Sequence, residues 1–462
     1  MFAAFELVPF RWVWSGALSG NSGRFAVILV AGWEAYRLGH HSSVWPSLVS
    51  MLLLVPTMFF GLFAGSVADR HNRALMAATG QMLNAVVCGS GALLTLTGHL
   101  DLTKLLVLTA VVGIGNSVQG PAWQAMIPEI VGRERLLNAS MTARVAQQGA
   151  ELTGPAIGTA VLTTAGPGAT FFLCATFYVA GLVMFVHVRG AVSTPARSAA
   201  RPGIVAPIAE GLSYVRRQAP IGTLLVWVGL HCSLTMASIG ILPAVATANL
   251  GGNAGAYGLL LAAFGFGSVL GPLLIMWLSG RASVAPTLVL SAVLSGLPLI
   301  SLGLVHQIDV DLISAAAAGA AQAVFMAAIY SANQGASIDA MRGRVASVQL
   351  SLTTGAMGLA SIGWGALVAL LAPGIVLAVP GAVFLAACIP FARRSRHVAA
   401  AVESNRSLGP NASRRQAAPR LLSTGSPFAH QESQTRRRGA TSSAGERVDF
   451  DLQVGDRLPG GP

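Results

Sequence analysis

Apolar segments long enough to cross a bilayer as helices recur along most of this chain. A bilayer core of roughly 30 Å needs about 20 apolar residues in a helix. Hydrophobic residues make up 53% of the chain and charged residues only 10%, whereas a soluble protein needs more charge to cover its surface. We predict an all-α membrane protein with twelve transmembrane helices, near residues 13–36, 44–67, 74–97, 104–126, 137–163, 168–188, 221–248, 254–279, 284–306, 309–331, 346–371 and 373–392.

Basic residues mark one side of the predicted bilayer. An even number of spans places both termini on the same side, where the loops and the central linker hold twelve arginines. The loops on the other side hold only Arg37 and Lys104. Because positively charged loops stay inside the cell, we expect both termini in the cytoplasm. The net charge of +12 follows from these loops and the tail, so we expect the lipid bilayer rather than nucleic acid as a partner.

Residues that mark particular loops and spans in the first half recur in the second half at a nearly constant distance along the sequence. Arg133 and Arg342, after spans four and ten, lie 209 residues apart, and so do Gly154 and Gly363 in spans five and eleven. A third pair, after spans two and eight, has an offset of 208. Parallel repeats of this kind build several transporter folds. We therefore predict two pseudo-symmetric six-helix bundles, at 1–189 and 220–395, a cytoplasmic linker at 190–219, and a disordered tail at 396–462.

The linker contains a short amphipathic segment, Ile208–Gln218. We expect it to form a helix on the membrane surface, with Tyr214 and Val215 facing the membrane and the adjacent arginines facing lipid headgroups.

Four short motifs occur at matching places along the predicted spans. The first, Gly61–Arg73, covers the end of span two and the loop after it, and the second, Gly120–Arg133, covers the end of span four. The third lies in span five, and the fourth, Arg342–Val345, follows span ten. The first contains Gly65, Asp69, Arg70 and Arg73, and the third contains Gly154, Pro155 and Gly158. Together the four motifs resemble the major facilitator superfamily, in particular its bacterial efflux branch, which includes siderophore exporters similar to the enterobactin exporter.

The resemblance implies a place in a bacterial cytoplasmic membrane, and it implies a role for two of these motifs. The first would form a cytoplasmic gate in which the Asp69 carboxylate caps a helix end and pairs with Arg70 or Arg73, although a purely structural loop is the alternative. The third is similar to the antiporter signature of the superfamily, in which a proline kinks span five. Thr159 stands where that signature usually has a second glycine.

Charged side chains inside apolar spans are costly and usually functional. Arg24 lies in span one, and Glu151 lies at a similar depth in span five, with Arg144 and Gln148 on the same helix face. Relative to the efflux branch, the signs of the charges at Arg24 and Glu151 are reversed. We expect the two to face each other as a buried ion pair. Either Glu151 exchanges a proton during transport, or the pair is static and fixes helix register.

Further polar and aromatic residues could line the cavity of such a transporter. These are Gln119, Trp123 and Gln124 in span four and His231 in span seven. Trp123 could stack on a flat substrate, whereas His231 is either a proton carrier or a hydrogen-bonded structural histidine. Few charged residues line the predicted cavity of the second half, which favours amphipathic or weakly charged substrates.

The sequence therefore predicts a proton-coupled exporter of small amphipathic molecules, drug-like or siderophore-like, that works by alternating access as a monomer. The alternatives are a uniporter or importer of a small metabolite, or a membrane sensor without transport. No P-loop, G-x-S-x-G or H-E-x-x-H motif occurs, so we do not expect an enzyme or an ATP-driven pump. The four cysteines form no C-x-x-C pair, and we expect neither metal nor cofactor.

Overall fold

A computed structural model of the chain describes residues 3–68, 72–192, 205–278, 284–338 and 341–407. Two of the predicted gating residues, Asp69 and Arg70, lie outside these ranges, as does most of the predicted tail. Residues Met1–Glu403 form one compact unit. Within it every regular element is helical, as far as the described ranges extend.

The first half contains four long helices. After a short 3-10 helix η1 (Ala3–Glu6) come α1 (Val8–Leu38), α2 (Val44–Ala68), α3 (Arg73–Leu96) and the very long α4 (Leu102–Val188). The backbone of α4 leaves helical geometry at Gly132 (φ 69°) and Gly166 (φ 82°). A positive φ at both places suits glycine, which has no Cβ to clash. These two breaks divide α4 into three segments, which correspond to the predicted spans four, five and six.

The second half begins with a short linker helix, α5 (Val205–Arg217). The next span is composite, because a 3-10 segment, η2 (Met236–Ile241), interrupts it between α6 (Ala219–Leu234) and α7 (Leu242–Leu250). Five single helices follow: α8 (Ala254–Leu278), α9 (Val284–Leu304), α10 (Ile308–Ala336), α11 (Arg342–Leu367) and α12 (Pro373–Ser407).

The predicted number of spans agrees with these helices. Nine described stretches are long and apolar enough to cross a membrane, and one of them, Glu134–Val188, contains two spans because of the break at Gly166. Helices α1 and α2 supply the remaining two. The prediction of an all-α membrane fold with twelve spans is thus confirmed.

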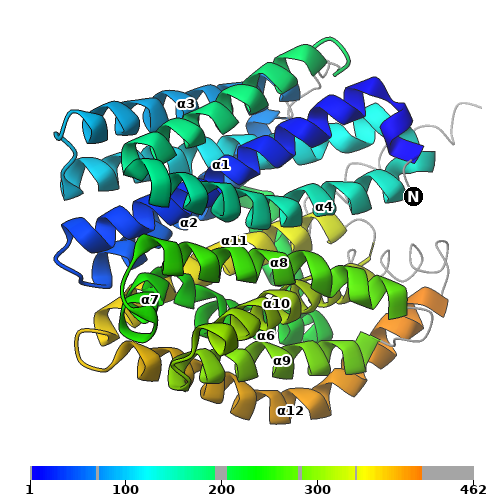
Figure 1. The fold of residues 1–462 in the computed structure, drawn as a ribbon. Helices are drawn as coiled ribbons and strands as arrows, with labels where there is room; N and C mark the ends of the chain where they lie inside the picture. Colours follow the sequence, from blue (N-terminus) through cyan, green and yellow to red (C-terminus); the bar gives the residue numbers. More distant parts are fainter. Residues whose placement is uncertain (1–2, 69–71, 193–204, 279–283, 339–340, 408–462) are drawn as a thin grey trace, which may run out of the picture. The chain divides into compact units, whose positions relative to one another are not determined.

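The helices gather into two bundles, α1–α4 and α6–α12, which Figure 1 shows above and below one another. The main contacts between the bundles join α4 to α8 and α2 to α11. Three clusters of buried apolar residues fill the interior. One contains residues of both bundles, such as Leu29 and Leu53 from the first and Val245 and Leu260 from the second. The other two are each confined to one bundle.

Two predictions need correction, one about the linker helix and one about where the tail begins. Val215 is 7% exposed and belongs to the core of the second bundle, and Tyr214 packs against the same core. These side chains therefore face the protein rather than the membrane, because α5 docks on α6 and α11. Helix α12 continues to Ser407, beyond residue 396 where we expected the tail to begin.

Candidate functional site

The shared core cluster lies at the end of the bundles that is distant from the basic loops. Its members include residues from the ends of α1 and α3 and the beginnings of α2 and α8, and residues at the end of α11 pack against it. The two separate clusters lie at the opposite ends of the same helices, near the basic loops. The bundles are therefore packed together on the predicted outer side and have separate cores on the predicted cytoplasmic side.

Serine and glycine residues make the contact between α2 and α11 very close. The Ser361 hydroxyl donates a hydrogen bond of 3.1 Å to the Ser47 carbonyl. A Cβ added at Gly365 would lie 2.8 Å from the Ser43 carbonyl oxygen, and one added at Gly240 of η2 would lie 2.8 Å from the Cα of Ser47. Small residues let helix backbones approach in this way within a membrane.

The contact between α4 and α8 extends from the predicted outer side to the middle of the helices. Near the predicted outer side, Gly258 packs directly against Thr159. At mid-helix, Gly265 faces the backbone of Glu151, and the Gln148 amide donates a hydrogen bond of 3.2 Å to the Ser268 carbonyl. The second bundle therefore meets the first at the residue that the sequence singled out as a buried acid.

Glu151 lines a pocket to which both bundles contribute. The other lining residues are apolar: Phe25 and Ile28 of α1, Pro155 of α4, Ile239 of η2, and Leu261 and Phe264 of α8. Glu151 is the one ionisable residue among these seven. A carboxyl group with apolar and aromatic neighbours can hold a proton or a cationic group while the walls take up apolar surface.

The predicted ion pair between Arg24 and Glu151 is not formed in this structure. Both residues are described, yet no nitrogen–oxygen distance between them is within 4.0 Å. The Arg24 guanidinium instead lies 5.7 Å from the ring centre of its neighbour Phe25. Its Nε has no hydrogen-bond partner among the described residues. The expectation is wrong for this conformation because spacing along two helices fixes depth but not the direction of a long side chain.

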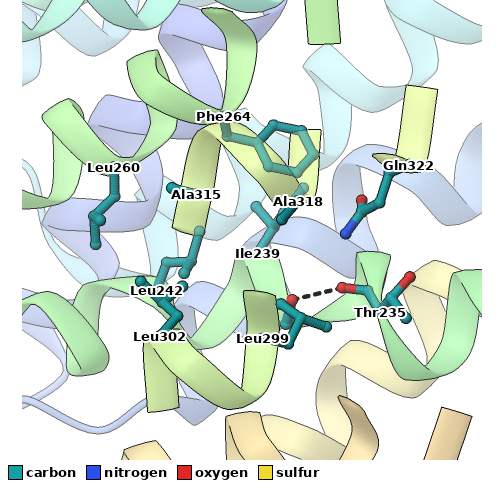
Figure 2. Close-up of a pocket in the computed structure, with 11 residues that line it drawn as sticks. Thr235, Ile239, Leu242, Leu260, Phe264, Leu299, Leu302, Ala315, Ala318 and Gln322 are labelled. Carbon is teal, nitrogen blue, oxygen red and sulfur yellow. Dashed lines mark hydrogen bonds between the residues drawn. The ribbon is translucent and has the colours of Figure 1, made fainter. Parts of the chain in front are cut away.

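A second pocket lies inside the second bundle and shares Ile239 and Phe264 with the first. Figure 2 shows Thr235 and Gln322 on one side of this pocket and Leu242, Leu260 and Leu302 on the other. The hydrogen bond of 2.7 Å that the Ser238 hydroxyl donates to the Thr235 carbonyl is drawn there. The two pockets together give an apolar region with polar groups at one edge.

The other predicted residues of span four lie away from these pockets. Gln119 is buried, and its amide donates a hydrogen bond of 3.2 Å to Asn116, which also accepts one of 2.9 Å from Asn84. Trp123 is buried in the core of the first bundle. Gln124 is exposed. None of these three residues lines either pocket.

His231 is a core residue of the second bundle. Its ring is fully buried, stacks on Phe325 with centroids 4.2 Å apart, and lies 5.3 Å from the ring of Phe384. One ring nitrogen lies 3.3 Å from the Ser295 hydroxyl. These contacts correspond to the hydrogen-bonded structural histidine rather than to a cavity residue.

Arg144 lies on the predicted cytoplasmic side of Glu151. Its guanidinium stands over the Tyr330 ring of α10, 4.9 Å from the centroid, and so connects the two bundles. Cation–π contacts of this kind stabilise by about 0.5–2 kcal/mol. Arg144 and Gln148 thus both reach across the interface, although neither lines a pocket.

The predicted gating motif is described only in part. Gly65 lies in the helical backbone of α2. Arg73 begins α3 and forms an ion pair of 2.9 Å with Glu129 near the end of the first segment of α4. It also donates a hydrogen bond of 3.2 Å to the Ala125 carbonyl. Arg73 therefore joins two helices of the same bundle at their predicted cytoplasmic ends.

The antiporter-like motif lies where α4 crosses α1. A Cβ at Gly154 would lie 2.5 Å from the Ser22 carbonyl oxygen, and one at Gly158 would lie 2.9 Å from Leu29. Both glycines are therefore required for close packing. The predicted counterpart of Gly154 in α11, Gly363, has open space around it, so the repeat does not extend to this contact. Helical geometry continues through Pro155, since α4 departs from it only at Gly132 and Gly166.

Sequence reasoning missed two buried acids, Glu34 and Asp311. Glu34 in α1 forms an ion pair of 2.6 Å with Arg37. Asp311 lies in the first turn of α10 and is fully buried, with neither carboxylate oxygen hydrogen-bonded to a described residue. Its position close to the polar loop before span ten made it resemble a loop residue. Among the described residues, no group of three or more His, Cys, Asp or Glu side chains could hold a metal ion.

Solved structures with a similar fold are transporters. A POT family transporter in complex with 5-aminolevulinic acid has a TM-score of 0.70 and 12% identity, covering 85% of this chain and 97% of that one. A second such structure, with a thioalcohol-conjugated peptide, has a TM-score of 0.70 and 13% identity over 84% and 96% of the chains. A mutant peptide transporter with alafosfalin has a TM-score of 0.68 and 12% identity over 86% and 96%. At such identities the likeness concerns the fold alone.

No curated protein matches the chain significantly. A family model described as transmembrane secretion effector matches residues 1–415, which include all twelve spans. This match and the transporter fold agree with the two bundles and with the pocket between them. The chain belongs to the transmembrane secretion effector family of the major facilitator superfamily and is a membrane transporter.

Proposed function

We propose that this transporter is a proton-coupled exporter of small amphipathic molecules. The observation that carries the proposal is the position of Glu151, the one ionisable residue of a pocket shared by the two bundles. A carboxyl group there can release a proton when the pocket opens to one side and take one up when it opens to the other. Buried carboxyl groups that serve this purpose are common in pumps and transporters.

The pocket favours substrates with apolar surface. Phe25 and Phe264 offer aromatic surface, and Leu261 and Ile28 offer aliphatic surface. A strongly anionic substrate would meet the Glu151 carboxylate without a cation in the pocket lining to balance it. Drug-like molecules and neutral or weakly charged siderophore-like molecules remain the proposed substrates.

The distribution of contacts between the bundles supports the proposal of alternating access. The bundles share a core on the predicted outer side and have separate cores on the predicted cytoplasmic side. An exporter must accept its substrate from the cytoplasm, and this arrangement is the one that would do so. We propose that the gate at Asp69, Arg70 and Arg73 closes the cytoplasmic side when the bundles rock. We further propose a monomer in a bacterial cytoplasmic membrane, with both termini in the cytoplasm.

The test is substrate-dependent proton flux in vesicles that contain the purified protein. Tetraphenylphosphonium and a catecholate siderophore serve as probes, and a pH-sensitive dye reports proton movement. Glu151→Gln should abolish proton movement coupled to probe efflux. Glu134→Gln is the matched control, because Glu134 lies on the same helix but is exposed. If Glu151→Gln still drives efflux with a proton gradient, the proton role is refuted.

A second pair of variants tests the relation between the two buried charges. Arg24→Glu combined with Glu151→Arg should transport no better than the single variants, because no direct ion pair joins the residues in this conformation. Recovery of transport by the double variant would show that they pair in another conformation. Probe movement without proton movement would instead indicate a uniporter.

A further inference from the structure

The second bundle contains a buried acid that the proposed function does not use. Asp311 is in α10, and its side chain is fully buried. Both of its carboxylate oxygens are without a hydrogen-bond partner among the described residues. No described basic side chain approaches it within 4.0 Å. A buried carboxylate is normally paired or accepts hydrogen bonds, because an isolated charge is very costly away from water.

A second aspartate at the start of a span, Asp101, provides a comparison for Asp311. Asp101 precedes span four, which corresponds to span ten in the repeat. It is exposed, accepts a hydrogen bond of 2.8 Å from the Lys104 backbone N–H, and forms an ion pair of 2.8 Å with the Lys104 ammonium group. Asp101 is thus a helix cap with a cation beside it. Asp311 has neither partner, although it lies at a similar place in its own bundle.

The start of α10 does not supply what the carboxylate lacks. A helix N-terminus favours a negative charge, but the effect is small and screened by solvent. The Asp311 backbone N–H is already engaged with the Gln307 carbonyl, at 2.9 Å. The Asp311 side chain accepts no backbone N–H of the first turn. Burial without a partner therefore outweighs the helix dipole and favours the neutral, protonated carboxyl group.

Titratable groups on the neighbouring elements do not balance Asp311 either. His306, in the loop before α10, is the nearest basic residue along the chain, and its side chain is exposed. In α9 no residue is titratable, and in α8 only Tyr257 is, whose hydroxyl donates to the Ile28 carbonyl in the first bundle. On α6, His231 and Cys232 are engaged within the core of the bundle.

The remaining charges on elements that contact α10 are distant along the helices. On α11 they are Arg342 and Arg344, which lie at the beginning of that helix, on the predicted cytoplasmic side. On α4, Arg144 stands over Tyr330, near the opposite end of α10. Asp311 lies at the predicted outer end of its helix, so these arginines cannot neutralise it.

Helix geometry places Asp311 beside the second pocket. Ala315, Ala318 and Gln322 line that pocket at spacings of three and four, and Asp311 lies four residues before Ala315. The four residues therefore share one face of α10. In Figure 2, Ala315 lies away from the polar side formed by Thr235 and Gln322. Asp311 is thus one turn beyond the apolar side of the pocket.

We propose that Asp311 is a second proton-binding site of this transporter, located in the second bundle and loaded with a proton in the conformation described. A metal cation is a poorer ligand for this place, because sodium-like and calcium-like ions need several oxygen ligands. The nearest hydroxyl on the same helix, that of Ser314, already donates to Ser301 at 3.0 Å. The ligand that satisfies a single unpartnered carboxylate is a proton.

The test is infrared spectroscopy of the full-length protein in a maltoside detergent, which has no carbonyl group of its own. A protonated carboxyl group gives a C=O stretching band that a carboxylate lacks. At neutral pH we expect this band in the Glu151→Gln background, which lacks the acid of the first pocket. Asp311→Asn in that background should lose the band. Asp309→Asn should keep it, because Asp309 lies in the same first turn but is exposed.

Isotope labelling provides a test that needs no substitution at Asp311. When aspartate carrying a ¹³C carboxyl is incorporated, the band should shift to lower frequency, whereas ¹³C-labelled glutamate should leave it in place. The proposal is overturned if the band is absent at neutral pH, or if its frequency does not change when labelled aspartate is incorporated. If the addition of sodium at constant pH removes the band, a metal cation binds in place of the proton, and the proposal is also overturned.

The role of Asp311 in coupling rests on the proposed function. In vesicles, Asp311→Asn should lose efflux of the probe driven by a proton gradient, and Asp309→Asn should retain it. The infrared measurement requires no transport. If no probe is exported but the band behaves as expected, the proposed function fails and the proton site stands. If export is coupled to protons and the band is absent, the proposed function stands and the proton site at Asp311 fails.

Discussion

The close contact of α4 with α8 can be loosened by one methyl group. A Cβ added at Gly265 would lie 2.6 Å from the Leu152 nitrogen and closer still to the Glu151 carbonyl oxygen. Ordinary contact begins near 3.4 Å, so Gly265→Ala requires the helices to separate by at least about 0.8 Å. Backbone atoms cannot rotate away as a side chain would. Overpacking of this kind costs about 1–3 kcal/mol.

That cost applies only where α4 and α8 are packed together. If the bundles rock apart in the other conformation, Gly265→Ala should shift the ratio of the two conformations about 5- to 150-fold towards it. Gly149→Ala is the matched control, because the new methyl group on α4 would only touch Leu18 at an ordinary 3.7 Å. Each substitution replaces glycine by alanine within a helix, so both variants gain the same free energy from helix propensity, at most about 1 kcal/mol.

The assay is pulsed electron paramagnetic resonance, which measures the distance between two spin labels at the predicted outer ends of the bundles. Cysteines placed at Ala165 and Gln307 are suitable positions, since both residues are exposed. The four native cysteines are buried, which favours labelling at the new sites. Gly265→Ala should add a population at longer distance. If its distance distribution matches those of Gly149→Ala and the unaltered protein, this reasoning about the interface is refuted.

Three further predictions concern polar residues outside the two pockets. Arg344→Ala removes the ion pair between Arg344 of α11 and Glu210 of α5. The free energy of unfolding should change by less than about 1 kcal/mol, but trypsin should cleave within α5 faster. An unchanged cleavage rate would contradict this prediction. The hydrogen bond from Lys104 lowers the pKa of Asp101. That contribution to stability is therefore present at neutral pH and is lost as the pH falls through the acidic range, so Asp101→Asn should flatten the acid limb of the unfolding profile. His231→Ala should destabilise the protein by about 2–5 kcal/mol through a core cavity and leave the proton-to-substrate ratio unchanged; an altered ratio would restore His231 as a proton carrier.

The site could be predicted only in part. The sequence singled out Glu151, because a charge within an apolar run is evident, and the fold places this residue in a pocket lining; its role in transport stays a prediction. Its pocket neighbours were not identified, since Phe25, Leu261 and Phe264 resemble any other apolar residues of a span. Trp123 and His231 were assigned to the cavity on residue type alone, and the fold places both in bundle cores. Residue type shows what a side chain could do, but helix rotation decides what it faces.

The sequence by itself determined the number of spans, the expected sidedness and the two halves. Those properties depend on hydropathy, charge and spacing, which are local along the chain, and a bilayer imposes them on any helix. Only the tertiary structure decided which ends of the bundles are in contact and where Arg24 points. It also decided that Asp311 is buried without a partner whereas Asp101 is exposed beside Lys104. The physical reason is that burial and pairing depend on neighbours from distant helices, so two aspartates that look alike in sequence can have opposite environments.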